Sequence, residues 1–461
     1  MTTTADLSAS LDVLRRQTTG AVITPSDDGY DGARSAWNLA YEHRPAVVVV
    51  AECTDDVVAA VRHARSAGLR IAVQTTGHGV ARVADAGAVL IDLSRLVDVR
   101  IDPEARTATV AGGTTWQPVL GEAAAHGLAP LLGSTPHVGA VGYTLGGGLG
   151  WLARAHGLCR DTLRAAQVVT LDGDVVEVSE ASNPELLWAL RGGGTAGLGI
   201  VTSMTVDLVP VTTVYGGNLL YPAEMAPEVM ARYAAWTADL PQGMTSSVVL
   251  MNFPPFEEVP EPLRGRSFVI VRGCFDGPVE EGQALVDAWR TWAPPVIDMF
   301  GPMPFSAVET ISNDPVDPMP AAVTTEWLTE LSGEVIDSLC AATYPAGGPP
   351  ALAFAEVRHV AGAMGRADGA ALGGTSDLLL EVVGPAPTPE VAEVVRSLQV
   401  GLRRQLAPFT TGGAYLNFTE GEEKQARSAS GFEAAALERL RAIKAEVDPE
   451  DVMSHGVDVC R

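Results

Sequence analysis

The sequence predicts an α+β protein of two domains, and three observations support this fold class. The chain has 461 residues, more than one ordinary hydrophobic core occupies, so more than one lobe is expected. Hydrophobic residues make up 47% and charged residues 19%, as in a globular protein. In the first half, short β-branched runs alternate with helical patterns, whereas Pro-rich loops interrupt the second half.

The first elements follow a β-α-β order. Residues 46–52 (AVVVVAE) and 70–74 (RIAVQ) are typical of strands, and the segment DDVVAAVRHARSAG between them is typical of a helix that ends in Gly. Further strands are expected in AVLIDLSRL, VDVRID and TATVAGG, before a helix in WQPVLGEAAAHG. A mixed α+β lobe therefore follows the β-α-β unit.

The remaining elements of this lobe surround a turn and a short helix. Asp172-Gly173 separates two β-branched runs, which predicts a hairpin, and NPELLWALRG predicts a helix opened by Asn-Pro. The strand GIVTSMTVDLVPV closes the lobe near Pro210.

The second half combines strands with Pro-rich loops. The segments SFVIVRGCF and LAFAEVRHV are expected to be strands, and loops such as NFPPFEEVPEPL exclude one long helical bundle. Near the end, FEAAALERLRAIKAEVDPEDV predicts an amphipathic helix stopped by Asp448-Pro449.

Charge and hydropathy exclude several classes of partner. The chain carries 31 Lys+Arg against 56 Asp+Glu, a formal charge of −25 that repels nucleic acid and anionic lipid. No apolar run approaches the roughly 20 residues that span a bilayer. The N-terminal stretch MTTTADLSASLDVLRRQ does not resemble a secretory signal, so a cytoplasmic protein is expected. The five scattered cysteines predict neither a disulfide framework nor a metal site.

The first candidate site is the loop Thr75-Thr76-Gly77-His78-Gly79, directly after the strand RIAVQ. Small residues at a strand end let backbone N–H groups bind a diphosphate without lysine. His78 could serve there as ligand, base or covalent tether, or simply fill a polar gap in a loop.

The second candidate site is the glycine-rich run from Gly133 to Trp151, with seven glycines in its first eighteen residues. This composition disfavours both helix and strand and favours close backbone approach, either to a cofactor or to another element. A third segment, residues 192–197 (GGGTAG), matches G-x-G-x-x-G. A helix precedes it and a strand follows, so we reject a Rossmann dinucleotide site.

Together these segments resemble one known family. The order of Trp37-Asn38, the His78 loop, the run PxVGxxGYxLGGGxGW, LLWALRGGG with GIVT, and a late Tyr-x-Asn with IKxxxDP is similar to the FAD-linked oxidases of the berberine bridge enzyme and 6-hydroxynicotine oxidase type. The resemblance covers nearly the whole chain and is most specific over residues 35–210.

The resemblance implies a two-lobed PCMH-type FAD-binding domain of residues 1–210, completed by 425–461. A substrate-binding domain, built on an antiparallel sheet with helices, would comprise residues 211–424. FAD would be attached through an 8α-histidyl bond. The implied cofactor-binding residues are Thr75, Thr76, Gly77, His78, Gly79, Ser134, Val138, Gly139, Gly142, Tyr143, Thr144, Gly147, Gly150, Gly199, Val201 and Asn417.

Many members of the family form a second bond from flavin to a cysteine. The corresponding position in this chain is Thr135, which has no sulfur. The resemblance therefore implies a single covalent link at His78.

Proton transfer in the substrate domain has two candidates. In the strand Phe354-Ala355-Glu356-Val357-Arg358-His359, alternation places Glu356 and Arg358 on one face. Glu356 is either a base or substrate anchor, or one half of an ion pair on a solvated face.

The other candidate comes from the resemblance. Tyr415 and Asn417 match the family's Tyr-x-Asn near the flavin, and they would share one face of a strand. Tyr415 is the first choice for the base, although a buried tyrosine bonded to a backbone carbonyl remains an alternative. His137 and Trp151 flank the glycine-rich run and would either face substrate or form a stacked core pair.

The leading hypothesis is an FAD-dependent oxidase of secondary metabolism. It would oxidise a small alcohol, amine or polyketide-like molecule by hydride transfer to flavin, with O2 as acceptor. The alternatives are a flavin-dependent oxidative cyclase or rearrangement enzyme, and a flavin-binding protein without turnover.

Overall fold

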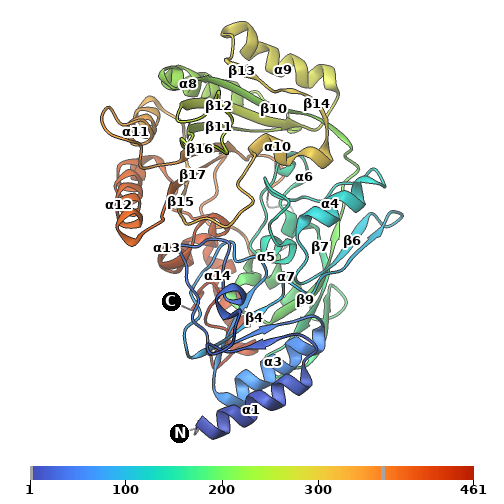
Figure 1. The fold of residues 1–461 in the computed structure, drawn as a ribbon. Coiled ribbons are helices and arrows are strands. Elements are labelled where there is room, and N and C mark those ends of the chain that lie inside the picture. Colours follow the sequence, from blue (N-terminus) through green and yellow to red (C-terminus); the bar gives the residue numbers. More distant parts are fainter. Residues whose placement is uncertain (1–3, 365–368, 461) are drawn as a thin grey trace.

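The computed structural model describes residues 4–364 and 369–460 (Figure 1). The first three residues of the N-terminal stretch discussed above lie outside the described residues. The described residues form three sheets, and the two smaller ones lie in the lower half of Figure 1. The arrangement is the α+β, two-domain fold that the sequence predicts.

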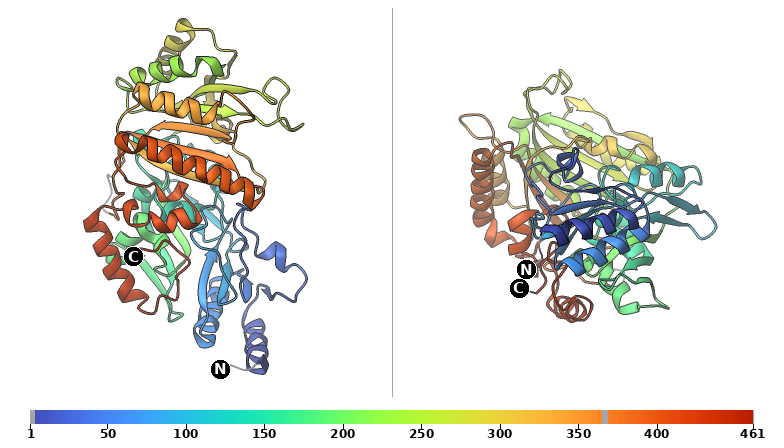
Figure 2. Two further views of the ribbon diagram at one scale, coloured as in Figure 1. Left: turned by 90° about the vertical axis from the view of Figure 1, so that its left-hand side faces the viewer. Right: turned by 60° about the horizontal axis from the view of Figure 1, so that its bottom comes forward.

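The first sheet contains the predicted β-α-β unit. Its four strands run in the order β1-β2-β4-β3, and β2, β4 and β3 are parallel. The bounds are β1 Val22–Ile23, β2 Val47–Val50, β3 Arg70–Gln74 and β4 Ala88–Asp92, with α1 Thr4–Gln17, α2 Tyr30–Ala33 and α3 Thr54–Ala67. Helix α3 ends at Gly68, whose φ of 67° is the left-handed conformation that favours glycine. Helices α1 and α3 lie side by side (Figure 2).

The second sheet is antiparallel, in the order β5-β6-β9-β7-β8. The hairpin predicted at Asp172-Gly173 joins β7 to β8. The bounds are β5 Val99–Asp102, β6 Thr107–Ala111, β7 Leu163–Val169, β8 Val175–Ser179 and β9 Ile200–Asp207, with α4 Trp116–Ala124, α5 Ala140–Leu145, α6 Ala153–His156 and α7 Pro184–Gly193. Residues 192–197 begin in the last two residues of α7 and lie before β9, as expected for a segment that is not a Rossmann turn.

The third sheet is eight-stranded and forms the upper half of Figure 1. Its order is β13-β10-β12-β11-β16-β17-β15, and β14 also pairs with β10. The strands are β10 Thr213–Pro222, β11 Met244–Asn252, β12 Ser267–Phe275, β13 Ile297–Asp298, β14 Gly301–Pro304, β15 Ala321–Leu328, β16 Phe354–His359 and β17 Leu378–Pro385. The helices are α8 Ala226–Thr237, α9 Val279–Trp292, α10 Glu309–Ser312, α11 Gly333–Thr343 and α12 Pro389–Leu406.

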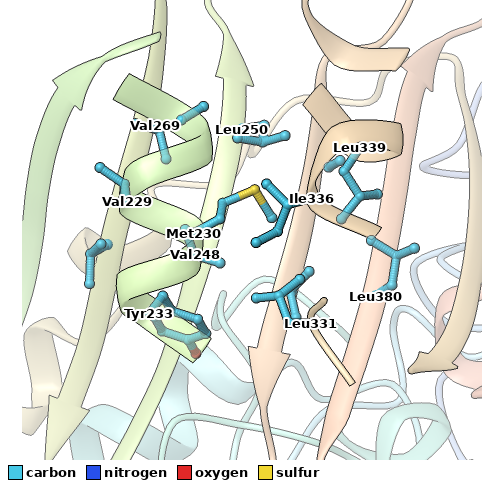
Figure 3. Close-up of a cluster of buried hydrophobic side chains, with 14 of the residues drawn as sticks. Val229, Met230, Tyr233, Val248, Leu250, Val269, Leu331, Ile336, Leu339 and Leu380 are labelled. Atoms are coloured by element: carbon cyan, nitrogen blue, oxygen red, sulfur yellow. The ribbon is translucent and has the colours of Figure 1, made fainter. Parts of the chain in front are cut away.

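Helices cover one face of this sheet. Helices α11 and α12 lie side by side across it (Figure 2). Met230 of α8 and Ile336 of α11 meet over the apolar side chains of the strands (Figure 3). Along β16 and β17 the side chains alternate, so Val357 joins this core while Glu356 and Arg358 lie on the opposite face. The polar face is therefore free to contribute to a site.

The chain ends beside the first two sheets. Helices α13 Gly421–Ala426 and α14 Ala434–Val447 follow the third sheet, and α14 packs on α7. The amphipathic helix predicted here ends at Asp448 as expected. Among the described residues, no helix is both long and apolar enough to cross a bilayer.

Two expectations about local structure are wrong. The glycine-rich run contains a short helix, α5, because Ala140, Val141, Thr144 and Leu145 can turn their side chains into the core. Tyr415 and Asn417 do not lie on a strand, since residues Leu416–Phe418 form a 3-10 turn. Period-2 alternation over three residues is too short to distinguish a strand from such a turn.

Candidate active site

The His78 loop begins where β3 ends and turns sharply through two glycines. Gly77 and Gly79 have φ values of 76° and 67°, in the left-handed region that favours glycine. A Cβ on Gly77 would also overlap the backbone of Ala36. These two positions explain why the loop requires glycine on both sides of His78.

The His78 imidazole is held by two neighbours. It stacks on the Trp37 ring, with centroids 4.4 Å apart and planes 19° apart, and its Nδ1 lies 2.8 Å from Thr76 Oγ1. Burial, with a contribution from His137, lowers the pKa of His78 to about 4. The imidazole is therefore neutral at neutral pH, the state in which a ring nitrogen is nucleophilic.

The loop meets the glycine-rich run at Gly139. Thr75 Oγ1 donates to the Gly112 carbonyl at 3.0 Å, which fixes its side chain. A Cβ on Gly139 would lie 2.9 Å from Thr75 Cγ2, so the absence of a side chain allows the two segments to approach. The structure thus brings together the first two candidate sites.

Within the glycine-rich run, the glycines serve different purposes. A Cβ on Gly150 would overlap the Leu132 carbonyl oxygen, and one on Gly146 would overlap the Asn417 amide. Asn417 Nδ2 donates to the Tyr143 carbonyl at 3.0 Å. Gly142, by contrast, is exposed and a Cβ there would touch nothing within 4 Å. Its surface is open to a ligand.

Three other predicted cofactor residues form hydrogen bonds within the protein. Thr144 is fully buried, and its hydroxyl donates to the Ala140 carbonyl. The Val138 carbonyl accepts from Trp116 N, and the Ser134 hydroxyl donates to Asp314 Oδ2 at 2.5 Å.

Gly199 immediately precedes β9 and Val201 lies in it, and β9 packs against α5 of the glycine-rich run. Gly199 has a φ of 123° and is adjacent to β7, where a Cβ would meet Val168. The Val201 side chain is part of a hydrophobic cluster. Either residue could therefore meet a cofactor only through its backbone.

Tyr415 is buried beside the glycine-rich run. A Cβ on Gly147 would lie 3.5 Å from the Tyr415 ring, which packs edge-on against Phe418 and Trp327. Burial raises the pKa of Tyr415, and the nearby Arg160 and Arg358 only partly oppose this. The phenol is therefore less acidic than an exposed tyrosine.

Glu356 lies in a buried charge network rather than on a solvated face. Its two oxygens bind Arg272 Nη2 at 2.7 Å and Arg358 Nη2 at 2.9 Å, and Arg358 also binds Glu381 at 3.0 Å. Burial favours the neutral acid, but the two guanidinium groups outweigh it and hold the pKa of Glu356 below its usual range. The alternative of a solvated ion pair is wrong, because Glu356 is fully buried.

A pocket lies where the two halves of the chain meet. Arg358 and Ser246 contribute from the third sheet, and Trp151 contributes from the end of the glycine-rich run. The lining residues are Ser134, Leu149, Gly150, Trp151, Thr245, Ser246, Arg358 and Val360. The pocket thus joins predicted cofactor positions to the polar face of β11 and β16.

The residues near the pocket suit an organic cofactor. The buried donors Tyr143 Oη and Trp151 Nε1 have no acceptor among the described residues. Among those same residues, no group of three or more His, Cys, Asp or Glu is arranged to hold a metal. Unpaired donors, open glycine backbone and a neutral histidine fit a flavin, whose ring presents acceptors and an alkylated edge.

Several residues that shape the site are not among the residues predicted from the sequence. Arg272 and Asp314 reach it from distant elements, and nothing in their local sequence indicates this. Glu420 and Lys424, which bind the backbone next to His78, were also missed. The Glu-x-x-x-Lys spacing of Glu420 and Lys424, shortly after Tyr-x-Asn, is the signal that could have identified them.

Comparison with known proteins finds similar sequences. A family model described as an FAD binding domain matches residues 45–179. (R)-6-hydroxynicotine oxidase of Paenarthrobacter nicotinovorans is 36% identical over 190 residues, 41% of each chain. An FAD-linked oxidoreductase of Dictyostelium discoideum is 28% identical over 301 residues, 64% of this chain and 63% of that protein. These matches span less than two thirds of the relatives' own lengths.

Solved structures share the fold over nearly the whole chain. A 6-hydroxy-D-nicotine oxidase from Arthrobacter nicotinovorans has a TM-score of 0.80 at 24% identity and covers 96% of this chain and 98% of its own. BBE-like 1 of Physcomitrella patens has a TM-score of 0.81 at 20% identity, with 96% and 97% covered. Residues 45–179 therefore match an FAD binding domain, and the chain is similar in sequence to 6-hydroxynicotine oxidase and in fold to that enzyme and to a BBE-like protein.

Proposed function

We propose that the protein oxidises a small organic alcohol, amine or polyketide-like metabolite, with FAD on His78 as hydride acceptor and O2 as final acceptor. The observation that carries this proposal is the pocket between the glycine-rich run and the polar face of β16. In the proposed division, residues 1–210 and 425–461 bind FAD and residues 211–424 bind the substrate.

The cofactor would be held mainly by backbone. The exposed backbone at Gly142 presents an unhindered surface, and Tyr143 and Trp151 offer unpaired donors. When bound, FAD supplies the acceptor for the hydride. A single link at His78 is proposed because Thr135 cannot form a thioether.

On the substrate side, the protein's own groups orient the substrate and move a proton. Arg358 lines the pocket and is held by Glu356 and Glu381, so its guanidinium cannot swing freely. Tyr415 is the proposed proton acceptor for the substrate O–H or N–H group. Because its pKa is raised, the deprotonated phenol becomes more abundant only as the solution turns alkaline.

Replacing the Tyr415 hydroxyl tests this function. Alcohols and amines are screened with hydrogen peroxide as the readout, and kcat/KM is then measured from pH 6 to pH 10. We expect kcat/KM of the natural protein to rise on the alkaline side, and Tyr415→Phe to lower it about 10²-fold or more and flatten the profile. Unchanged turnover in Tyr415→Phe would show that another group transfers the proton.

Tyr344→Phe is the matched control. Tyr344 is a partly buried tyrosine whose hydroxyl donates to the Phe268 carbonyl, and it packs against the helix-covered core of the third sheet. Its removal should leave the pH profile intact. If no compound yields peroxide while FAD is bound, the proposal of oxidase activity is wrong.

A further inference from the structure

The residue that follows His78 is bound on both sides of its backbone by two oppositely charged side chains, the partly buried Glu420 and the buried Lys424. Gly79 N donates to Glu420 Oε1 at 2.9 Å, and Lys424 Nζ donates to the Gly79 carbonyl at 2.7 Å. Glu420 immediately precedes α13 and Lys424 lies one turn further along it. One short helix therefore holds both polar groups of Gly79.

The contact with α13 continues along the loop. Gly421 N donates to the Val80 carbonyl at 2.7 Å, and Gln425 Nε2 donates to the Ala81 carbonyl at 3.1 Å. The chain after His78 is thus bound to α13, which lies more than 330 residues away in the sequence. Since Gly79 has a positive φ, these bonds also stabilise the turn that directs the His78 side chain.

The second oxygen of Glu420 is also used. It accepts from Asn38 Nδ2. The backbone of Ala321 fixes the orientation of the Asn38 amide, because Ala321 N donates to Asn38 Oδ1 and Asn38 Nδ2 donates to the Ala321 carbonyl, both at 3.0 Å. Asn38 can therefore only donate toward Glu420. A carboxylate satisfies both Asn38 and Gly79, whereas a glutamine would present one donor to another.

Burying this pair is costly. Lys424 is 5% exposed, and burial lowers its pKa to about 8 despite Glu420. Burial likewise raises the pKa of Glu420, although Lys424 opposes the shift. Replacing such a pair with neutral groups often leaves stability unchanged, so stability alone does not explain its presence. Neither residue lines the pocket, and both bind the peptide next to His78.

We propose that Glu420 and Lys424 are positioning residues for covalent flavin attachment: by fixing Gly79 they hold the His78 imidazole where it can react with the flavin. The inference rests on the proposed link at His78. In that reaction a C–N bond forms between the imidazole and the 8α carbon. One proton leaves the methyl group and one leaves the imidazole, while the electron pair reduces the flavin and then O2, giving hydrogen peroxide.

The double variant Glu420→Gln with Lys424→Met provides the test. Removing both charges leaves no unpaired buried ion, so the fold should persist. Protein purified from a riboflavin-limited host is mixed with excess FAD, and the flavin that stays with acid-precipitated protein is followed over time. A misplacement of about 1 Å can slow a reaction about 10²-fold, so we expect attachment to be slower by that order.

A second measurement separates positioning from binding. In a His78→Ala background, where no link can form, the FAD dissociation constant is measured with and without the double variant. We expect it to change less than about threefold, because the lost bonds act on the His78 loop rather than on FAD. A large loss of affinity would show that the pair supports binding, and would overturn the positioning role.

The control removes a comparable pair elsewhere. Lys444 Nζ binds Asp448 Oδ2 at 2.5 Å and the Gly197 carbonyl at 3.0 Å, and both side chains are buried. Lys444→Met with Asp448→Asn should leave the attachment rate at saturating FAD unchanged. If this control slows attachment as much as the test variant does, the effect is a general consequence of losing a buried pair.

The outcomes also distinguish this inference from the proposed link. If the natural protein releases all its flavin on acid precipitation, the proposed link at His78 is wrong. If the natural protein retains flavin and the double variant retains it at the same rate, the link stands and the positioning role of Glu420 and Lys424 is wrong.

Discussion

Gly142 and Gly150 lie eight residues apart in the same run, and the structure gives each a different reason to be glycine. Gly150 lies against the chain itself, since a Cβ would overlap the Leu132 carbonyl oxygen. Gly142 is exposed within α5, where a Cβ would meet no protein atom within 4 Å. The sequence does not distinguish these two roles, because both residues are glycines in the same glycine-rich run.

This difference yields a prediction for two alanine variants. Gly150→Ala should lower the free energy of unfolding by about 1–3 kcal/mol, because the methyl group displaces backbone. Gly142→Ala should leave the flavin-free protein as stable, or about 0.5–1 kcal/mol more stable, since alanine favours helix. If FAD follows the run closely, the same Gly142→Ala variant should bind FAD more weakly.

The measurements are urea unfolding without flavin and FAD titration. Gly121→Ala is the control, because Gly121 lies in α4 with nothing within 4 Å of its would-be Cβ, and no cofactor is proposed there. It should raise stability similarly and leave FAD affinity unchanged. Equal FAD affinity in Gly142→Ala and the natural protein would contradict the proposed path of the cofactor.

Among the elements, α6 ties the glycine-rich run to the third sheet. Its Arg154 is buried and donates to the carbonyls of Ala361, Pro241 and Met244, at 2.7, 2.9 and 2.5 Å. All three acceptors belong to the segment proposed to bind substrate. One side chain therefore connects the proposed cofactor and substrate domains.

Removal of this connection should be costly. Arg154→Met removes a buried guanidinium that bonds three carbonyls, of which the Met244 carbonyl is buried, and we expect the free energy of unfolding to fall by about 2–4 kcal/mol. Arg264→Met is the control, because Arg264 also donates to a backbone carbonyl, Glu257 O at 2.7 Å, but is exposed. Unfolding followed by circular dichroism measures both. A loss in Arg154→Met no larger than that in the control would contradict the connecting role.

The elements also show what the sequence can predict. The β-α-β unit and the hairpin at Asp172-Gly173 were predictable because their signals lie within one short segment. The 3-10 turn after Tyr415 was not, because packing against Trp327 and Phe418 decides it rather than local pattern. The contact of Glu420 and Lys424 with Gly79 joins segments far apart in the chain, and secondary-structure propensity cannot predict such a contact.

At the site, too, features set by local sequence were predictable and contacts between distant segments were not. The His78 loop was identifiable because its glycines mark a backbone turn. The surroundings of Glu356 were not, because Arg272 comes from β12, two strands away in the sheet. A single strand shows which residues share a face but not which side chains a neighbouring strand places beside them.

For the whole molecule, buried histidines should make stability depend on pH. Burial lowers the pKa of His43, His78 and His359 to about 4 in each case. Between this value and the ordinary pKa of about 6.5, the unfolded chain binds more protons than the folded one. Stability should therefore fall as pH decreases from about 6.5 toward 4.

The size of this effect can be isolated with one variant. The buried His43 should account for about 1–2 kcal/mol between pH 7 and pH 5, so His43→Gln should reduce the pH dependence of the unfolding free energy by that amount. His126→Gln, at an exposed position, should not alter the dependence. A pH dependence identical in His43→Gln and the natural protein would contradict the neutral, buried state of His43.

Acid precipitation followed by peptide mass mapping decides whether His78 carries the flavin. The neutral imidazole, the two flanking glycines and the absence of sulfur at Thr135 predict one flavin per chain, on the peptide that contains His78. The His78→Ala variant should release its flavin into the supernatant. Free flavin from the natural protein, or flavin mass on any other peptide, would contradict covalent attachment at His78.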